Sequence, residues 1–167
     1  MPDSIDWQQV EAEAVDLLCG YLRIDTTNPP GQEQAAAEDL QRALARFGIA
    51  ARLGQAAPGR ANLLARVPAD APTAPPLVLT HHMDVVTADP TTWTSDPFGG
   101  VERDGFIYGR GTLDTKALGI LHLLGLGLFV QQATQRTRDI IYLAVCDEEA
   151  TSTAGARWVL EHWRDDL

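Results

Sequence analysis

Cysteine is scarce in this sequence: only Cys19 and Cys146 occur among its 167 residues. The first lies in a helical pattern and the second ends an apolar run, two places where free cysteines serve as small apolar side chains. We therefore predict no disulfide. With 45% hydrophobic and 22% charged residues, the chain has the composition of a globular protein. Its length fits one domain with its own core.

Positive charge is also in short supply. Lysine and arginine together number 13 against 23 acidic residues, which gives a net charge of -10, and Lys116 is the single lysine. The arginines are spread along the chain without a basic run, so phosphate backbones and anionic lipids would be repelled. The sequence therefore predicts neither a nucleic acid nor a membrane as a partner.

A secretion signal and a membrane-spanning run are missing from the pattern as well. The N-terminus is acidic and lacks the basic start and apolar core of a signal peptide. The longest apolar stretch, residues 118–130, is interrupted by His122 and is shorter than the roughly 20 residues of a membrane span. A cytoplasmic location is therefore expected.

Helical periodicity begins near the N-terminus. Apolar residues recur there at helical spacing, at Val10, Ala14, Leu17 and Tyr21. Ser4 or Asp6 would cap this helix. A second helix is predicted at residues 32–47, ended by Gly48, and a third at 116–131, which is almost entirely apolar and is therefore expected to be buried. A last helix is predicted at about 153–163.

Short β-like runs alternate with these helices. We predict strands at residues 61–67 and 77–80, a hairpin turn at 103–106, and a central strand at 139–146. This alternation indicates a layered α/β domain.

Acidic and histidine clusters follow the predicted strands, where open α/β sheets place their ligands. Asp84 can reach the imidazole of His82, because residues two apart on an extended segment point the same way. Asp114 follows a glycine-bearing turn, and by itself would more often be a helix N-cap. Glu148 and Glu149 end an acidic triplet that, taken alone, could be a solvated turn.

The order of these clusters resembles a known family. H-x-D, then G-R-G-x-x-D-x-K, then D-E-E is the pattern of the two-zinc peptidases and deacylases that include aminoacylase, acetylornithine deacetylase, succinyl-diaminopimelate desuccinylase and the glutamate carboxypeptidases. Further matches are spread along the chain, at Asn28-Pro29-Pro30-Gly31, Gly59-Arg60-Ala61-Asn62, Trp93 to Phe98, Asp104-Gly105 and Gly155-Ala156. The resemblance implies a three-layer α/β/α zinc-peptidase-like catalytic domain with a central mixed sheet.

The resemblance also implies a role for each site residue. His82 would bind one zinc ion, Glu149 the other, and Asp114 both, with Co²⁺ or Mn²⁺ as possible replacements for Zn²⁺. Asp84 would orient His82, and Glu148 would be the general base. The peptide bond from Asp114 to Thr115 is expected to be cis.

Departures from the family pattern concern residues that bind no metal. The family usually has Gly in place of His81 and Met in place of Thr115. His122 and His162 are interpreted as structural, since no carboxylate motif accompanies either. These departures leave the metal assignment intact and make the loop shapes, and with them substrate choice, less predictable.

Family members are more than twice as long as this chain. Residues 1–167 would be the N-terminal part of the catalytic domain, without the lid and dimerisation domain or the C-terminal part. The parent protein would be a metal-dependent hydrolase of amide or peptide bonds in small N-acyl amino acids or short peptides, and the absent domain would be the place for a homodimer contact. The alternatives are a non-catalytic metal-binding or assembly remnant and a different two-metal aminopeptidase of the same architecture.

Overall fold

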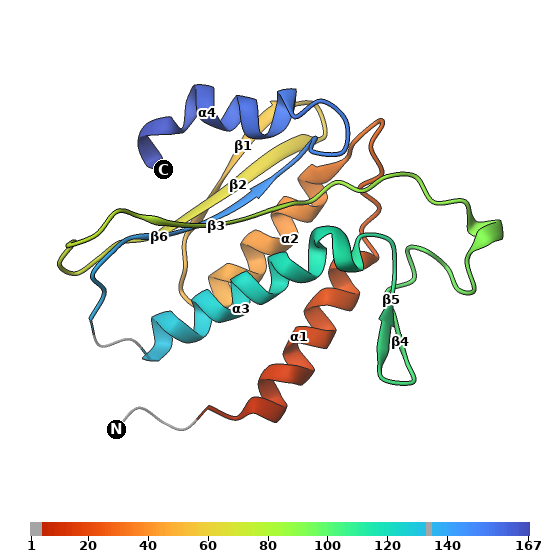
Figure 1. Cartoon of the computed structure of the whole chain (residues 1–167), viewed down its shortest axis with the longest axis horizontal. Coiled ribbons are helices and arrows are strands. Elements are labelled where there is room, and N and C mark those ends of the chain that lie inside the picture. Colours follow the sequence, from red (N-terminus) through yellow and green to blue (C-terminus); the bar gives the residue numbers. More distant parts are fainter. Residues whose placement is uncertain (1–4, 133–134) are drawn as a thin grey trace.

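The computed structural model describes residues 5–132 and 135–167. Four strands form a central sheet: β1 (Ala51–Ala57), β2 (Arg60–Val67), β3 (Leu77–His82) and β6 (Ile140–Val145). Their order in the sheet is β1-β2-β6-β3 (Figure 1). The β1–β2 and β2–β6 pairs are antiparallel and the β3–β6 pair is parallel. The sheet is therefore mixed, with the expected strand at 139–146 inside it.

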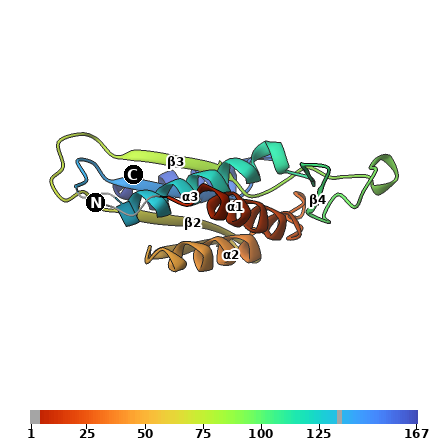
Figure 2. The same ribbon diagram turned by 90° about the horizontal axis from the view of Figure 1, so that it is seen from below.

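Helices cover both faces of this sheet. One face carries α1 (Trp7–Leu22), α2 (Glu33–Arg46) and α3 (Ala117–Gln132), and the other carries α4 (Trp158–His162). Figure 2 shows the sheet close to edge-on, with α2 below β2. Side chains of β6 alternate between the two cores, with Tyr142 and Ala144 on the three-helix side and Leu143 and Val145 on the α4 side. The predicted three-layer α/β/α fold is confirmed.

Local sequence signals fix several element ends. The Asp6 carboxylate accepts hydrogen bonds from the N–H groups of Gln8 and Gln9 and so caps α1; Ser4, the other predicted cap, lies outside the described residues. Gly48 follows α2 with φ at 72°. A short hairpin, β4 (Val101–Arg103) and β5 (Phe106–Tyr108), turns at Asp104 and Gly105, which have φ of 55° and 77°.

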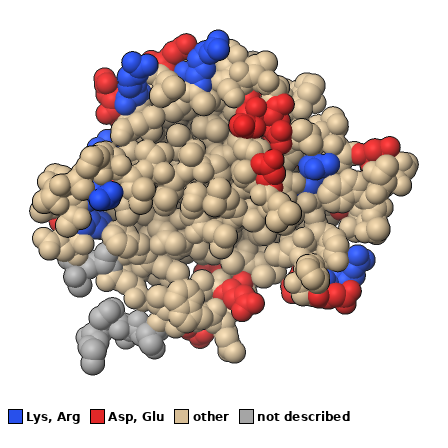
Figure 3. Space-filling view, viewed as in Figure 1, with Lys and Arg blue, Asp and Glu red and all other residues tan. Residues whose placement is uncertain are grey.

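The prediction that the 116–131 helix is buried is wrong for one side of α3. Leu118 and Leu121 are 42% and 62% exposed. Leu118 lines a hollow together with Thr80 and His81 of the edge strand β3, whose Leu77 and Val78 are also exposed. β3 pairs only with β6 among the described residues. Few charged side chains lie over β3 and α3 in Figure 3, so this end of the sheet exposes apolar surface.

Length and composition alone would allow one helix to cross a membrane. The segment Thr112–Gln132, which is α3 and the turn before it, has 21 residues and is 39% buried over its most apolar window. This is weak evidence, because the core helix of a soluble protein passes the same test. In this fold the buried side chains of α3 belong to the main core, at Ile120, Leu123, Leu124 and Leu126.

Leu40 of α2 offers a test of that core, because its side chain is only 1% exposed. Leu40→Ala is expected to lower the free energy of unfolding by about 2–5 kcal/mol, through lost burial and the cavity that remains. Leu113 is 93% exposed, so Leu113→Ala, the matched control, should change stability by less than about 0.5 kcal/mol. Urea titrations followed by circular dichroism measure both. Equal stabilities for the two variants would contradict the placement of α2.

Candidate metal centre

Three segments far apart in the sequence meet at the ends of β3 and β6. His82 is the last residue of β3, Asp114 lies in the turn Thr112–Lys116, and Glu149 follows β6. One ligand atom from each lies within 4.8 Å of the other two, and His82 Nε2 is 3.0 Å from Asp114 Oδ1. The structure thus brings together the three residues that the sequence analysis named as metal ligands.

His82 is held through its other ring nitrogen. Its Nδ1 lies 3.0 Å from the backbone oxygen of Asp84 and 3.6 Å from the carboxylate Oδ1 of the same residue. A proton on Nδ1, shared with that oxygen, leaves the Nε2 lone pair facing Asp114, which is the state a metal ligand needs. Asp84 is expected to orient His82 through its side chain, but its backbone oxygen makes the closer contact with the imidazole.

The charges around His82 favour a cation. Burial by itself lowers the pKa of His82, but the carboxylates of Asp84 and Asp114 outweigh burial and raise the pKa to about 9. Burial raises the pKa of Glu149, as do the negative charges of Asp114, Asp84 and Glu148, while His82 opposes them. Imidazole and carboxylate donors are those that zinc and related divalent metals take in proteins. The residues present therefore fit a metal ion.

The Asp84 carboxylate connects His82 with the turn that carries Glu148 and Glu149. It is fully buried and accepts hydrogen bonds of 3.0 Å from the backbone N–H groups of both Glu148 and Glu149. It accepts a third, of 2.8 Å, from Asn28 Nδ2. Burial raises the pKa of Asp84, but hydrogen bonds to His82 and these donors lower it overall. Asp84 therefore stays ionised and fixes the turn that carries the two glutamates.

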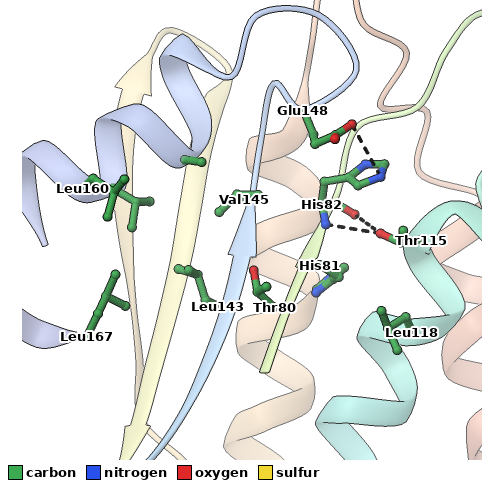
Figure 4. A pocket seen from close by; sticks show the side chains of 12 residues that line it. Thr80, His81, His82, Thr115, Leu118, Leu143, Val145, Glu148, Leu160 and Leu167 are labelled. Carbon is green, nitrogen blue, oxygen red and sulfur yellow. Dashed lines mark hydrogen bonds and ion pairs between the residues drawn. The ribbon is translucent and has the colours of Figure 1, made fainter. Parts of the chain in front are cut away.

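Glu148 lies beside His82, with Oε2 3.9 Å from Nε2, and its side chain is 55% exposed. Two hollows lie beside the residues of the metal centre. One, of about 450 Å³, is lined by His82, Glu148 and apolar side chains on both faces of β3 (Figure 4). The other, of about 650 Å³, is lined by Asp114, Glu149 and the 106–113 segment. Glu148 can therefore reach a small molecule in the first hollow.

The turn before α3 is shaped by its neighbours. The bond from Asp114 to Thr115 is cis, as expected. The Thr115 hydroxyl accepts from the His82 N–H and donates to the His82 carbonyl, each at 3.2 Å. Lys116 is fully buried, and its Nζ donates to the Tyr21 and Ile24 carbonyls at 3.2 and 2.9 Å; burial lowers its pKa to about 8. Lys116 thus anchors the turn to the end of α1.

The other histidines take no part in the described donor cluster. His81 points to the opposite face from His82, as expected, where its Nε2 contacts the Tyr21 hydroxyl at 3.2 Å. Burial, above all, lowers the pKa of His81 to about 3. A Cβ atom on Gly119 would lie 2.3 Å from His81 Nε2, so the imidazole fills space that glycine leaves. Neither His122 nor His162 contributes to the donor group found among the described residues.

The predicted absence of a disulfide is confirmed, since Cys19 and Cys146 are both free and buried. Cys146 directly follows β6, and its backbone N–H donates to Asn62 Oδ1 at 3.0 Å. Asn62 also donates to the Ala154 carbonyl at 2.8 Å. Asn62 thus joins the two ends of the 147–154 turn. Cys146 takes part through its backbone N–H and its buried side chain.

Comparison with known proteins agrees with this geometry. The family model for peptidase family M20/M25/M40 matches residues 78–167, which is more than half of the chain and includes every predicted site residue. The chain belongs to this family. The family resemblance inferred from the sequence motifs is therefore confirmed.

Among M20 relatives, the chain is 32% identical over 158 residues to the N-fatty-acyl-amino acid synthase/hydrolase of Xenopus tropicalis, covering 89% of this chain and 30% of that protein. It is 32% identical over 146 residues to aminoacylase-1 of Sus scrofa, covering 87% of this chain and 36% of that protein. The chain therefore spans about a third of the length of these relatives.

Solved structures show the same fold. Human carnosine dipeptidase 1 matches with a TM-score of 0.65 and 25% identity, over 92% of this chain and 36% of that one. A dinuclear metal-binding M20 peptidase of Bacillus subtilis matches with a TM-score of 0.64 and 17% identity, over 94% and 40%. The M20 catalytic-domain architecture thus holds at low sequence identity.

Proposed function

We propose that this chain is part of a metal-dependent hydrolase that cleaves amide or peptide bonds in small N-acyl amino acids or short peptides. The observation that carries the proposal is the convergence of His82, Asp114 and Glu149, with Glu148 beside them. The names of its relatives, an aminoacylase and a fatty-acyl-amino acid hydrolase, support this substrate class. We place the protein in the cytoplasm.

In the proposed site His82 would hold one Zn²⁺ ion and Glu149 the other, and Asp114 would be a ligand of both. Bound metal ions supply polarisation of the scissile carbonyl and a water of lowered pKa. Glu148 takes the proton from the attacking water and delivers it to the leaving amine. Its exposed carboxylate, 3.9 Å from His82 Nε2, is close enough to the ligands and open enough to the substrate for both transfers.

The same proposal makes residues 1–167 the N-terminal part of a catalytic domain. Its M20 relatives are about three times as long. The edge of β3 that pairs with no other described strand leaves apolar side chains uncovered on both faces, with Leu118 on one side and Leu160 on the other (Figure 4). Two protein ligands for each metal, one of them shared, fall short of the three in a usual catalytic zinc site. This chain alone is therefore expected to bind metal weakly and turn over little substrate.

A zinc titration of the chain by calorimetry tests the site. Asp114→Ala is expected to weaken zinc binding by at least about 100-fold, since even residues that only support a ligand are worth 10- to 100-fold. Asp70→Ala removes an exposed carboxylate that pairs with Arg136 and should bind zinc as the wild type does. Unchanged affinity in Asp114→Ala would refute the assignment.

A further inference from the structure

A line of buried polar groups runs from α2 to the metal centre. Glu33, at the start of α2, is fully buried and accepts hydrogen bonds from Arg60 Nη2 at 2.7 Å and Nε at 3.2 Å. Arg60 Nη1 lies 3.3 Å from Asp147 Oδ1. Asn28 Nδ2 then joins Asp147 Oδ1, at 3.2 Å, to Asp84 Oδ2, at 2.8 Å. The line ends on the carboxylate that holds Glu148 and Glu149.

The loop at residues 28–31 is built around this line. Gly31 has φ at 79° and lies under the Arg60 guanidinium, whose Cζ would be 2.5 Å from a Cβ atom on that glycine. Only glycine combines that backbone conformation with so close an approach. The segment Asn28-Pro29-Pro30-Gly31 therefore packs against Arg60. The two are far apart in the sequence, so the sequence alone does not reveal this contact.

Asn28 keeps two carboxylates together. Asp84 and Asp147 are both buried, at 0% and 3% exposure, and would repel each other. The amide NH₂ of Asn28, itself 5% exposed, offers a hydrogen to each. A flipped amide would turn its oxygen toward both carboxylates, so the chemistry fixes its orientation.

Arg60 fixes the turn from the other side. Its guanidinium forks between Glu33 and Asp147, a geometry that lysine cannot reproduce. Asp147 has φ at 63°, and its Oδ2 accepts hydrogen bonds from Thr151 Oγ1 and the Ala154 N–H. Asp147 is therefore held by Arg60 and by hydrogen bonds within its own loop.

We propose that Asn28 and Arg60 are positioning residues that hold the Asp147-Glu148-Glu149 turn through Asp147 and Asp84. Held in this way, Glu149 lies close to His82 and Asp114, and Glu148 faces His82. This inference rests on the proposed two-metal function for its catalytic meaning. The contacts that carry it belong to the chain itself, and they are testable without substrate.

The test uses the whole 167-residue chain, with Co²⁺ as the probe. Visible absorption of bound Co²⁺ reports both affinity and ligand geometry, and hydrogen exchange in the metal-free protein reports the Glu148 and Glu149 N–H groups bonded to Asp84. The variants are Asn28→Ala, Asn28→Asp and Arg60→Lys. Arg52→Ala is the matched control, because Arg52 forms an exposed ion pair with Asp166 far from the turn.

Asn28→Ala is expected to weaken Co²⁺ binding roughly 10- to 100-fold, alter its absorption spectrum and speed exchange of the two amides. Asn28→Asp should be worse than Asn28→Ala, because it adds a third carboxylate between Asp84 and Asp147. A packing role alone predicts the opposite order, since Asp matches Asn in size. Arg60→Lys keeps the charge and loses the fork, so a smaller loss of the same kind is expected even if an Asn28 variant fails to fold.

Wild-type affinity, spectrum and exchange in Asn28→Asp and Arg60→Lys would overturn the inference. A wild-type chain that binds no Co²⁺ would count against the proposed function instead. In that case the exchange of the Glu148 and Glu149 amides still decides the positioning role: faster exchange in the variants than in Arg52→Ala supports it, and equal exchange refutes it.

Discussion

Glu148→Gln is expected to lower the rate of amide hydrolysis roughly 100- to 10,000-fold, the usual contribution of a general acid–base group, and to leave metal content unchanged. The amide matches the carboxylate in shape but cannot accept the proton of the attacking water. Glu148 touches the donor cluster only at 3.9 Å from His82 Nε2, so its loss should spare the proposed ligands. The assay is hydrolysis of an N-acetyl amino acid by a protein that carries this chain within a full-length M20 catalytic domain.

Glu161→Gln is the matched control for that experiment. Glu161 is an exposed acid on α4, outside the donor group found among the described residues, and the same substitution there should leave the rate unchanged. Zinc content measured by atomic absorption separates loss of the base from loss of the metal. A Glu148→Gln enzyme with full zinc and the wild-type rate would remove Glu148 from the mechanism.

Zinc affinity of the chain is expected to rise about tenfold for each pH unit up to pH 9 and then level off. His82 has a pKa of about 9, so below that pH its imidazole carries a proton, and a metal ion must displace it. Between pH 6 and pH 9 the expected gain is therefore roughly 500-fold, because half of the imidazole still carries its proton at pH 9. Calorimetric titrations at several pH values measure it.

Proton release supplies the control for this pH dependence. Zinc binding at pH 7, repeated in buffers of different ionisation enthalpy, should release about one proton per binding event from His82. His82→Ala should bind weakly at every pH and lose most of the slope. An affinity that is flat between pH 6 and pH 9 in the wild-type chain would contradict the protonated state assigned to His82.

The sequence indicated the members of the metal cluster but could not reveal what holds them. His82, Asp114 and Glu149 lie at the end of a strand or in the loop after one, and the rule that ligands gather at strand ends predicts their meeting. The Asp84 carboxylate accepts hydrogen bonds from the N–H groups of Glu148 and Glu149. These bonds depend on how the turn after β6 folds back toward Asp84, and no residue pattern predicts that. Nor could sequence reasoning assign a role to Asn28 and Arg60, which it noted only as points of resemblance.

Two fold predictions were limited for physical reasons. The strand β1 escaped prediction because its sequence is rich in alanine, carries Gly54 and Gln55 and lacks the β-branched residues that mark strands. The helix α3 is apolar on nearly all sides, so periodicity cannot tell which side the protein covers. Exposed Leu118 and Leu121 show that this depends on neighbours outside the helix.

The contact between His81 and Gly119 restricts the order in which these two positions can change. A methyl group at position 119 would meet the His81 ring at 2.3 Å, while a glycine at position 81 would leave a void beside Tyr21 and Tyr142. A descendant of this chain that replaces the histidine by a smaller residue gains room for a larger one on the helix, and the reverse order of events is blocked. Substitution histories at these two sites should therefore run in one direction.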